Sequence, residues 1–300
     1  LWSWIVCGFL LLFLGATFVF HQFSLRNESK LLTPIGKQVT VNGHRMNVSV
    51  KGEGSETIVF LSGAGIASPI LDFKNLSDSL SKKYKVVVVE RAGYGFSEDS
   101  DRSRDVMEVL SETRQALAQA HVSGPYVIIS HSMASLESLA WQEKYPNEVK
   151  ALIGLDWALP ESYEDLKEHP TLITLAYWTS KIGLLRYFPE SFYIKNPTLT
   201  ETERQQYKLL AYKQLMSQAM LHESRLAKGN AKFHLALIRK FQPYSWFLTV
   251  KARPLVNRSG RTMQKIFLET SLMFKSTIWM RLTTSIIIKA MLLFLVLKNF

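Results

Sequence analysis

The chain has 300 residues, which is enough for one large domain or two small ones. Hydrophobic residues make up 47% of it, so a disordered chain is excluded. Cys7 is the only cysteine, which rules out an intrachain disulfide and a cysteine-based metal site. The net charge of +11 would suit a nucleic-acid partner. However, residues 241–300 hold nine Lys and Arg and the single acid Glu269, so the rest is nearly balanced and we expect no nucleic-acid partner.

The first twenty residues form an uncharged apolar run, Leu1–Phe20. As a helix this run is about 30 Å long, which matches the hydrocarbon core of a bilayer. We therefore expect a transmembrane anchor over residues 1–22, a linker over 23–35 and a folded domain on the extracytoplasmic side. A cleaved signal peptide and a buried helix are the alternatives. Gly15-Ala16-Thr17 would be a poor cleavage site, because the apolar run continues beyond it.

Short strand patterns follow the linker. Val39–Val41 and Met46–Val50 alternate in the manner of strands, and the Asn42-Gly43 pair between them predicts a hairpin. Four later runs are continuously apolar, which indicates strands buried on both faces of a parallel sheet. These runs are Thr57–Leu61, Lys85–Glu90, Tyr126–Ser130 and Ala151–Leu155.

Helical patterns alternate with these strands and cover Ile70–Ser81, Val106–Ala120 and Met133–Tyr145. This alternation predicts a doubly wound α/β domain with a mostly parallel sheet, over residues 36–300. From about residue 160 to 240 the sequence is helical and rich in Tyr, Trp and Leu. We expect this part to form a helical cap over the ends of the strands.

A candidate nucleophile, Ser132, lies between the strand that ends at Ser130 and the next helix. Small residues two positions to either side, here Ser130 and Ala134, are what a sharp nucleophile elbow requires. The N–H of Met133 would then face an oxyanion on the substrate. An ordinary serine-rich turn is the alternative interpretation. His131, next to Ser132, is expected to form a wall of the site.

Two loops fall where this chemistry needs them. Leu61–Gly65 follows the first buried strand, and Ala64 is the best candidate for a second backbone donor to the oxyanion. Glu90-Arg91-Ala92-Gly93-Tyr94-Gly95-Phe96-Ser97 follows the next strand. Gly93-x-Gly95 is too short for a dinucleotide fingerprint. His44, His121, His169 and His222 are expected to be surface or packing residues, and no metal-ligand spacing is present.

With these motifs in order, residues 36–160 resemble the α/β-hydrolase family, and in particular its membrane-anchored bacterial members. The similar segments are LSGAGIASP, VVVVERAGYGFSE, HSMAS and YPNEVKALIGLDWALPE. The second segment usually reads Asp-Arg-x-Gly-x-Gly-x-Ser in the family, and Ser62 stands where His is usual. The resemblance implies hydrolysis of an ester, amide or related acyl bond in a small-molecule or peptide substrate. The reaction would use a Ser132 acyl-enzyme and no cofactor or metal.

The family's catalytic triad runs serine, acid, histidine along the chain. Here Asp165 is the last Asp and His234 the last His, so the usual positions of both partners lack them. Asp156, at the end of the ALIGL strand, is the tentative acid, and His234 is the tentative base. The alternative to an active hydrolase is an inactive relic of the family or a binding protein.

Residues 241–300 form an atypical tail with no Asp and no His. Its apolar run, Ile286–Leu297, contains Lys289 and is too short to span a bilayer. One interpretation is an amphipathic terminal helix. The other is a shifted reading frame, because codons that encode residues 242–251 and 281–300 can spell an Asp-containing strand and a His-Tyr-Ile-His segment in a neighbouring frame. We expect the tail as written to leave the sheet incomplete and the chain to be a weak or inactive hydrolase.

Overall fold

The computed structural model describes residues 2–167, 169–240, 247–256 and 262–269, with side chains described as far as residue 233. Within these residues the core is a mixed, mostly parallel sheet with the strand order β1-β2-β4-β3-β5-β6-β7-β8. The strands are β1 (Lys37–Val41), β2 (His44–Lys51), β3 (Thr57–Leu61), β4 (Lys85–Glu90), β5 (Tyr126–His131), β6 (Val149–Leu155), β7 (Phe247–Val256) and β8 (Thr262–Glu269).

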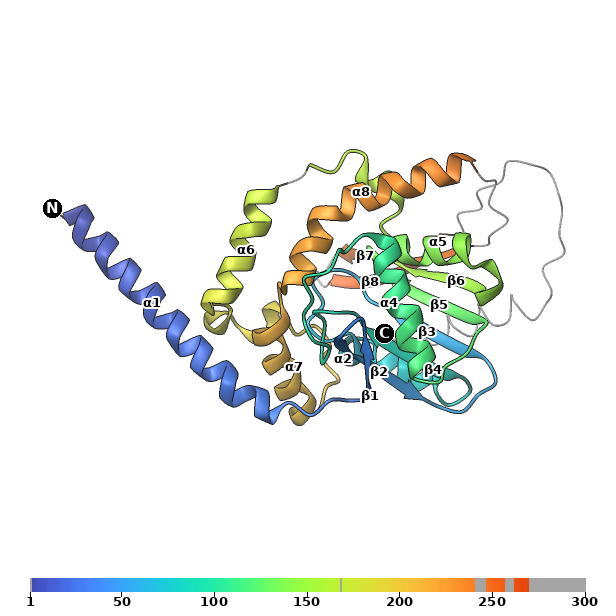
Figure 1. Cartoon of the computed structure of the whole chain (residues 1–300), viewed down its shortest axis with the longest axis horizontal. Helices are drawn as coiled ribbons and strands as arrows, with labels where there is room; N and C mark the ends of the chain where they lie inside the picture. The colour runs from blue at the N-terminus through green and yellow to red at the C-terminus, as the bar shows by residue number, and fades with distance from the viewer. Residues whose placement is uncertain (1, 168, 241–246, 257–261, 270–300) are drawn as a thin grey trace.

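Helices cover both faces of this sheet (Figure 1). The α-helices are α1 (Trp2–Glu28), α2 (Pro69–Asp72), α3 (Lys74–Leu80), α4 (Val106–Gln119), α5 (Ala134–Lys144), α6 (Pro170–Ile182), α7 (Glu201–Gln214) and α8 (Gln218–Lys240). The 3-10 turns are η1 (Ser29–Leu31), η2 (Pro146–Glu148), η3 (Pro160–Tyr163), η4 (Leu184–Tyr187) and η5 (Glu190–Phe192). The doubly wound α/β fold predicted from the sequence is confirmed.

The continuous apolar runs form strands that are buried on both faces. In β3, Val59 and Leu61 join a hydrophobic cluster with residues of α4, α5 and α8. Ile58 and Phe60 point to the opposite face and join a second cluster with residues of α2 and α3. Because successive side chains of a strand point to opposite faces, an unbroken run of apolar residues is what two helical layers require.

The predicted hairpin at Asn42-Gly43 is also confirmed. β1 and β2 are antiparallel, and Val41 pairs with His44 across a two-residue turn. Asn42 and Gly43 have φ angles of 51° and 84°. Turns with two residues at positive φ match the twist of the flanking strands, which is why Asn-Gly is favoured there.

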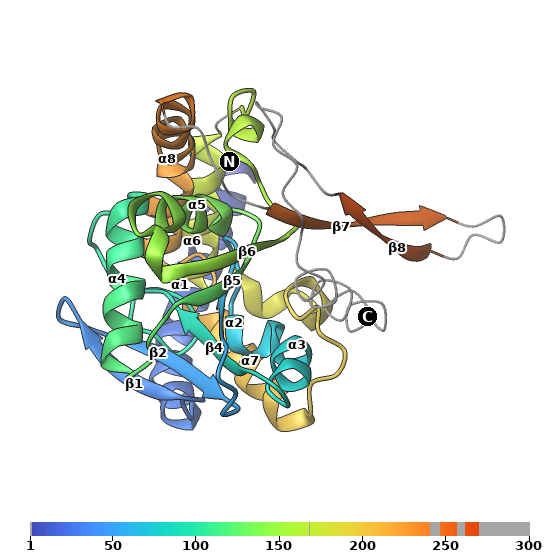
Figure 2. The same cartoon turned by 90° about the vertical axis from the view of Figure 1, so that its right-hand side faces the viewer.

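The expectation that residues 241–300 leave the sheet incomplete is wrong for two segments of the tail. β7 pairs in parallel with β6 over Phe247–Val250, and β8 pairs antiparallel with β7. Phe, Leu, Thr and Val in this part of β7 suit a strand, and pairing satisfies the backbone groups that β6 would otherwise expose. Figure 2 shows β7 and β8 extending beyond the rest of the sheet. Residues 241–246, 257–261 and 270–300, including the predicted terminal helix, lie outside the described residues.

The N-terminal helix α1 continues to Glu28, into the part predicted to be a linker. It is long and apolar enough to cross a membrane, a test that a signal sequence also passes. Its C-terminal part contacts the helical segment between β6 and β7. The Nε of Arg186 donates to the Nδ1 of His21 at 2.8 Å, and its guanidinium pairs with the Glu28 carboxylate at 2.7 Å.

A buried carboxylate, that of Glu90 at the end of β4, organises the loop that follows. It accepts hydrogen bonds from the N–H of Phe96 at 2.8 Å and from the side-chain amide of Asn47 at 3.0 Å. Gly95 has a φ of 52°, and a Cβ there would overlap the Glu90 carboxylate. Burial raises the pKa of Glu90 to about 7, although the hydrogen bonds oppose this shift.

We predict that Glu90→Gln removes a pH dependence of stability. An unfolded chain releases the Glu90 proton near pH 4.5, whereas the folded protein releases it at about 7. Between these values the unfolded state binds fewer protons, so the wild-type free energy of unfolding should fall as pH rises, by roughly 3 kcal/mol. Urea unfolding in detergent across this pH range measures the fall. This contribution should be lost in Glu90→Gln, which leaves the smaller fall that comes from Asp72, whose pKa burial raises to about 6. The full fall should be retained in the matched variant Glu53→Gln, which changes an exposed residue. An equal fall in the Glu90 variant would contradict the assignment.

Candidate active site

The predicted nucleophile lies in a sharp turn between β5 and α5. Ser132 has a φ of 50°, in the left-handed region that non-glycine residues seldom adopt. Ser130 and Ala134, two residues to either side, are completely buried. Such a conformation costs about 1–3 kcal/mol and persists only where the surroundings impose it. This geometry agrees with a nucleophile elbow that lifts the serine out of the sheet.

The loop after β6 holds this turn on its other side. The N–H of Ser132 donates to the carbonyl of Leu155 at 3.1 Å, and the N–H of Ala158 donates to the carbonyl of Ser132 at 3.2 Å. The indole N–H of Trp157 is 2.9 Å from both the carbonyl and the Oγ of Ser130. These bonds fix the backbone of the turn against residues 155–158.

The glycine-rich loop after β3 packs against the elbow. A Cβ on Gly63 would lie 2.9 Å from both the Cβ of Ser132 and the Nδ1 of His131, so only glycine fits there without displacement. Within the described part of the chain, the backbone N–H groups of Ala64 and Met133 donate to no backbone acceptor. The two predicted oxyanion donors thus belong to segments that pack against each other at Ser132.

The buried guanidinium of Arg91 stabilises the loop after β3 through the carbonyl groups of that loop. Its Nη2 donates to the carbonyl of Ser62 at 2.9 Å and approaches that of Gly63 at 3.4 Å. Its Nη1 lies 3.4 Å from the carboxylate of Glu137 in α5, and its Nη2 lies 3.5 Å from that of Glu223 in α8. Burial acts to lower the pKa of Arg91, but Glu223 and Glu137 outweigh it, so the pKa is raised.

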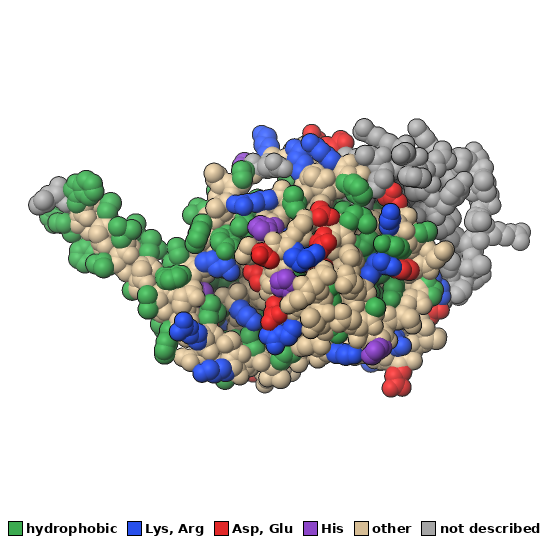
Figure 3. All heavy atoms as spheres, in the orientation of Figure 1, with side chains coloured by type: hydrophobic (Ala, Val, Ile, Leu, Met, Phe, Trp, Pro, Cys, Tyr) green, Lys and Arg blue, Asp and Glu red, His purple; other side chains and the backbone are tan. Residues whose placement is uncertain are grey.

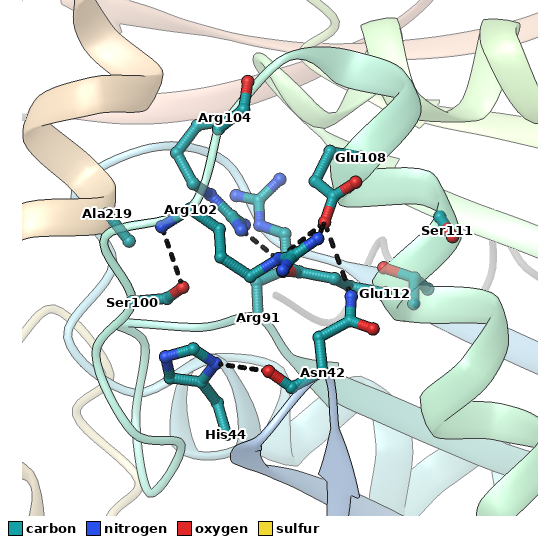
Figure 4. Close-up of polar contacts among 12 residues, drawn as sticks. Asn42, His44, Arg91, Ser100, Arg102, Arg104, Glu108, Ser111, Glu112 and Ala219 are labelled. Carbon is teal, nitrogen blue, oxygen red and sulfur yellow. Dashed lines mark hydrogen bonds and ion pairs between the residues drawn. The ribbon is translucent and has the colours of Figure 1, made fainter.

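The ionic network continues through Arg104, whose side chain is completely buried. Arg104 pairs with Glu112 of α4 at 2.6 Å and with Glu223 at 3.1 Å. The hydroxyl of Tyr94 donates to Glu223 at 2.6 Å. Figure 4 shows Arg91 and Arg104 beside the start of α4, with Arg102 bonded to Glu108 on the outer side. Each buried charge thus has an opposite charge beside it, which offsets the cost of removing it from water.

The sequence did not indicate this network. Arg91 belongs to a motif that we had identified, but Glu137 and Glu223 occur in helices at positions that carry no motif. Only the position of Glu137 gives a weak indication: it lies five residues after Ser132, near the start of α5 and therefore near the proposed site.

The structure describes the side chain of the predicted acid but not that of the predicted base. Asp156 follows β6, next to the residues that bond the elbow, and it is exposed and has a φ of 47°. Burial lowers the pKa of His131, and the nearby Asp156 carboxylate opposes this shift. His234 belongs to α8, but its side chain lies outside the described residues. The structure therefore brings together the turn at Ser132, both donor positions and Asp156, and leaves His234 untested.

This arrangement defines the class of protein: a doubly wound α/β fold with a nucleophile turn between a central strand and a helix. No family model matches the chain. It is 38% identical over 215 residues to the uncharacterized protein YbdG of Bacillus subtilis, a match that covers 69% of the chain and 66% of YbdG. It is 26% identical to the serine hydrolase BPHL of Mus musculus over 48% of the chain and 50% of that protein. The chain thus spans two thirds or less of the length of these relatives.

Solved structures agree on the fold. One example is ALR0039 of Nostoc sp PCC 7120, described as a proposed α/β-hydrolase. It has a TM-score of 0.52 and 14% identity, and the match covers 71% of this chain and 79% of ALR0039. The chain therefore has the α/β-hydrolase fold.

We predict that Arg91→Lys slows the reaction at Ser132 and destabilises the fold. A single ammonium group cannot reach the Ser62 carbonyl and both carboxylates together, so hydrogen bonds to charged groups are lost, at a cost of about 2 kcal/mol. We expect a several-fold slower reaction with an active-site probe and a lower urea midpoint. Arg102→Lys is the matched control, because its side chain is 42% exposed in the segment that leads to α4. Wild-type values for both quantities in Arg91→Lys would show that Arg91 does not position the loop.

Proposed function

We propose that the chain is a serine hydrolase that cleaves an ester, amide or related acyl bond through an acyl-enzyme on Ser132. The observation that carries this proposal is the positive φ of Ser132 in a turn against which the Gly63 loop packs. In the first step the Oγ of Ser132 attacks the acyl carbon and gives up its proton to a base. The N–H groups of Ala64 and Met133 stabilise the negative oxygen. The leaving group departs with a proton, and water then releases the acyl group as an acid.

The proposed acid is Asp156, which lies between the two residues that bond the Ser132 backbone, and the proposed base is His234, the last histidine of the chain, so the order serine, acid, histidine is kept. His131 is a second candidate for the base. Its Nδ1 and the Cβ of Ser132 both lie 2.9 Å from the position that a Cβ on Gly63 would take, so the imidazole is near Ser132. A lowered pKa keeps its imidazole neutral near pH 7, and a neutral imidazole can accept a proton. Comparing His131→Ala with His234→Ala distinguishes the two.

A second function is binding without turnover, because no histidine follows His234 and the usual position of the family's catalytic base lacks one. Without a base the serine hydroxyl is a weak nucleophile near neutral pH. Reactivity of Ser132 therefore separates the two functions.

We predict that a fluorophosphonate probe labels the protein at Ser132. Ser132→Ala should abolish labelling and reduce short-chain ester turnover by a factor on the order of 10⁴–10⁶. Ser123→Ala, a change in an exposed loop before β5, should keep both. Labelling that survives in Ser132→Ala would refute the nucleophile, and a wild-type protein that is never labelled would favour binding without turnover.

We further propose that α1 is an uncleaved membrane anchor with the domain outside the cytoplasm. An anchored chain should stay in carbonate-washed membranes and keep residues 2–20 by intact mass. Leu10→Arg with Leu11→Arg should release it, because each Arg near the centre of the helix costs about 3 kcal/mol of insertion. Leu10→Ala with Leu11→Ala is the matched control. Recovery of the full-length wild type in the carbonate supernatant would exclude the anchor, and a shorter mass would show a signal peptide.

A further inference from the structure

We propose that the outer face of the helical cap is a second membrane contact, inserted into the interfacial layer of the bilayer that α1 crosses. This inference rests on the proposed anchor. We define the cap face as six exposed apolar side chains of α6, η4 and the residues around η5. These are Leu172, Leu175, Trp178, Tyr187, Phe188 and Phe192.

The cap face concentrates apolar side chains that are otherwise rare at the surface of this domain. Among the described residues from Leu31 to Phe233, eleven large apolar side chains are exposed, and six of them belong to the cap face. Leu172, Leu175 and Trp178 are spaced three residues apart, so they share one face of α6. Large exposed apolar side chains that gather on one part of a surface mark a contact with another protein or with a membrane.

Among the described residues, neighbouring helices contact other sides of α6, and the side chains of this face are exposed. On one side, the Nη2 of Arg225 in α8 donates to the Oγ1 of Thr174 at 3.0 Å. Near the end of α6, Gln22 of α1 donates to the carbonyl of Lys181 at 3.5 Å. A shallow apolar groove runs along the free side and is lined by Pro170, Thr171, Thr174, Leu175 and Trp178.

The position of α1 identifies the bilayer as the occupant. The hydroxyl of Tyr187 lies 3.5 Å from the Oγ1 of Thr17, and its ring lies 6.0 Å from that of Phe13, centroid to centroid. Phe13 precedes Phe20, the end of the apolar run, by seven residues, or about 10 Å of helix. If the run spans the hydrocarbon core, the cap must reach below the plane where the run ends.

The polar contacts next to Tyr187 agree with a cap that reaches just below the membrane surface. Arg186 pairs with His21 and Glu28, which follow the apolar run and would lie at the membrane surface. Trp and Tyr are the residues that prefer the boundary between headgroups and hydrocarbon, and Trp178 and Tyr187 supply them here. Figure 3 shows hydrophobic side chains continuing from α1 onto the adjoining flank of the domain. An amphipathic surface lying in the interface, beside a spanning helix, satisfies all of these contacts.

Spin labels on the full chain test the proposal. In a Cys7→Ser background, single cysteines replace Leu12 in α1, Leu175 in the cap face and Glu53 in the exposed turn between β2 and β3. Each labelled protein is reconstituted into vesicles of phosphatidylethanolamine and phosphatidylglycerol. Collision with oxygen, which concentrates in lipid, is compared with collision with a water-soluble nickel chelate.

We expect oxygen to dominate at Leu12 and Leu175 by several-fold, and the nickel chelate to dominate at Glu53. A nickel-accessible label at Leu175, with lipid-exposed Leu12, would overturn the cap contact and leave the anchor standing. A nickel-accessible label at Leu12 would overturn the anchor and this proposal with it. A label at Leu175 shielded from both reagents would show a protein partner or a second copy on the cap face, which also overturns the membrane contact.

Discussion

The geometry around Ser132 depends on one buried charge, the guanidinium of Arg91. Removing such a group from water costs several kcal/mol unless carboxylates and carbonyls surround it. Arg91 meets this requirement with groups from three different parts of the chain: the loop after β3, α5 and α8. The first carries Ala64, one of the two proposed oxyanion donors. The second follows Ser132, the proposed nucleophile, and the third belongs to the helical cap. The cost of separating any of them from Arg91 keeps the three together.

This arrangement also explains how the loop can lack the histidine that is usual in the family. Ser62 stands at that position, and its Oγ is buried without a hydrogen-bond partner among the described residues. Its side chain therefore contributes no bond that would order the loop. The carbonyl of Ser62 instead accepts a hydrogen bond from Arg91, which follows the neighbouring strand β4, and this bond fixes the backbone of the loop. A loop that is ordered through its carbonyls keeps its N–H groups free for a substrate oxygen, which is what the reaction needs.

The parts that could be predicted from the sequence are those set by neighbouring residues. Continuous apolar runs identified β3 to β6, and the Asn42-Gly43 pair identified the hairpin, because both signals arise within a few residues. The turn at Ser132 was predictable for the same reason. The partners of Arg91 were not, since Glu223 follows it by more than a hundred residues and no local pattern relates them. The tail was judged by its charge and its missing motifs, whereas β7 is formed by pairing with β6, an interaction between segments far apart in the sequence.

A second set of contacts relates the N-terminal helix to the same loop. Arg186, which pairs with Glu28 of α1, also lies over the ring of Tyr212 in α7, 4.3 Å from its centroid. In the same helix the hydroxyl of Tyr207 donates to Asp72, the last residue of α2, at 3.0 Å. The helix α2 begins four residues after Gly65 and packs against α7, which belongs to the part of the cap that contacts α1. The cap is therefore fixed both to the site, through Glu223, and to α1, through Arg186. A cap with these two attachments places the turn at Ser132 relative to α1, so if α1 crosses a bilayer, the membrane surface limits the directions from which a ligand can approach Ser132.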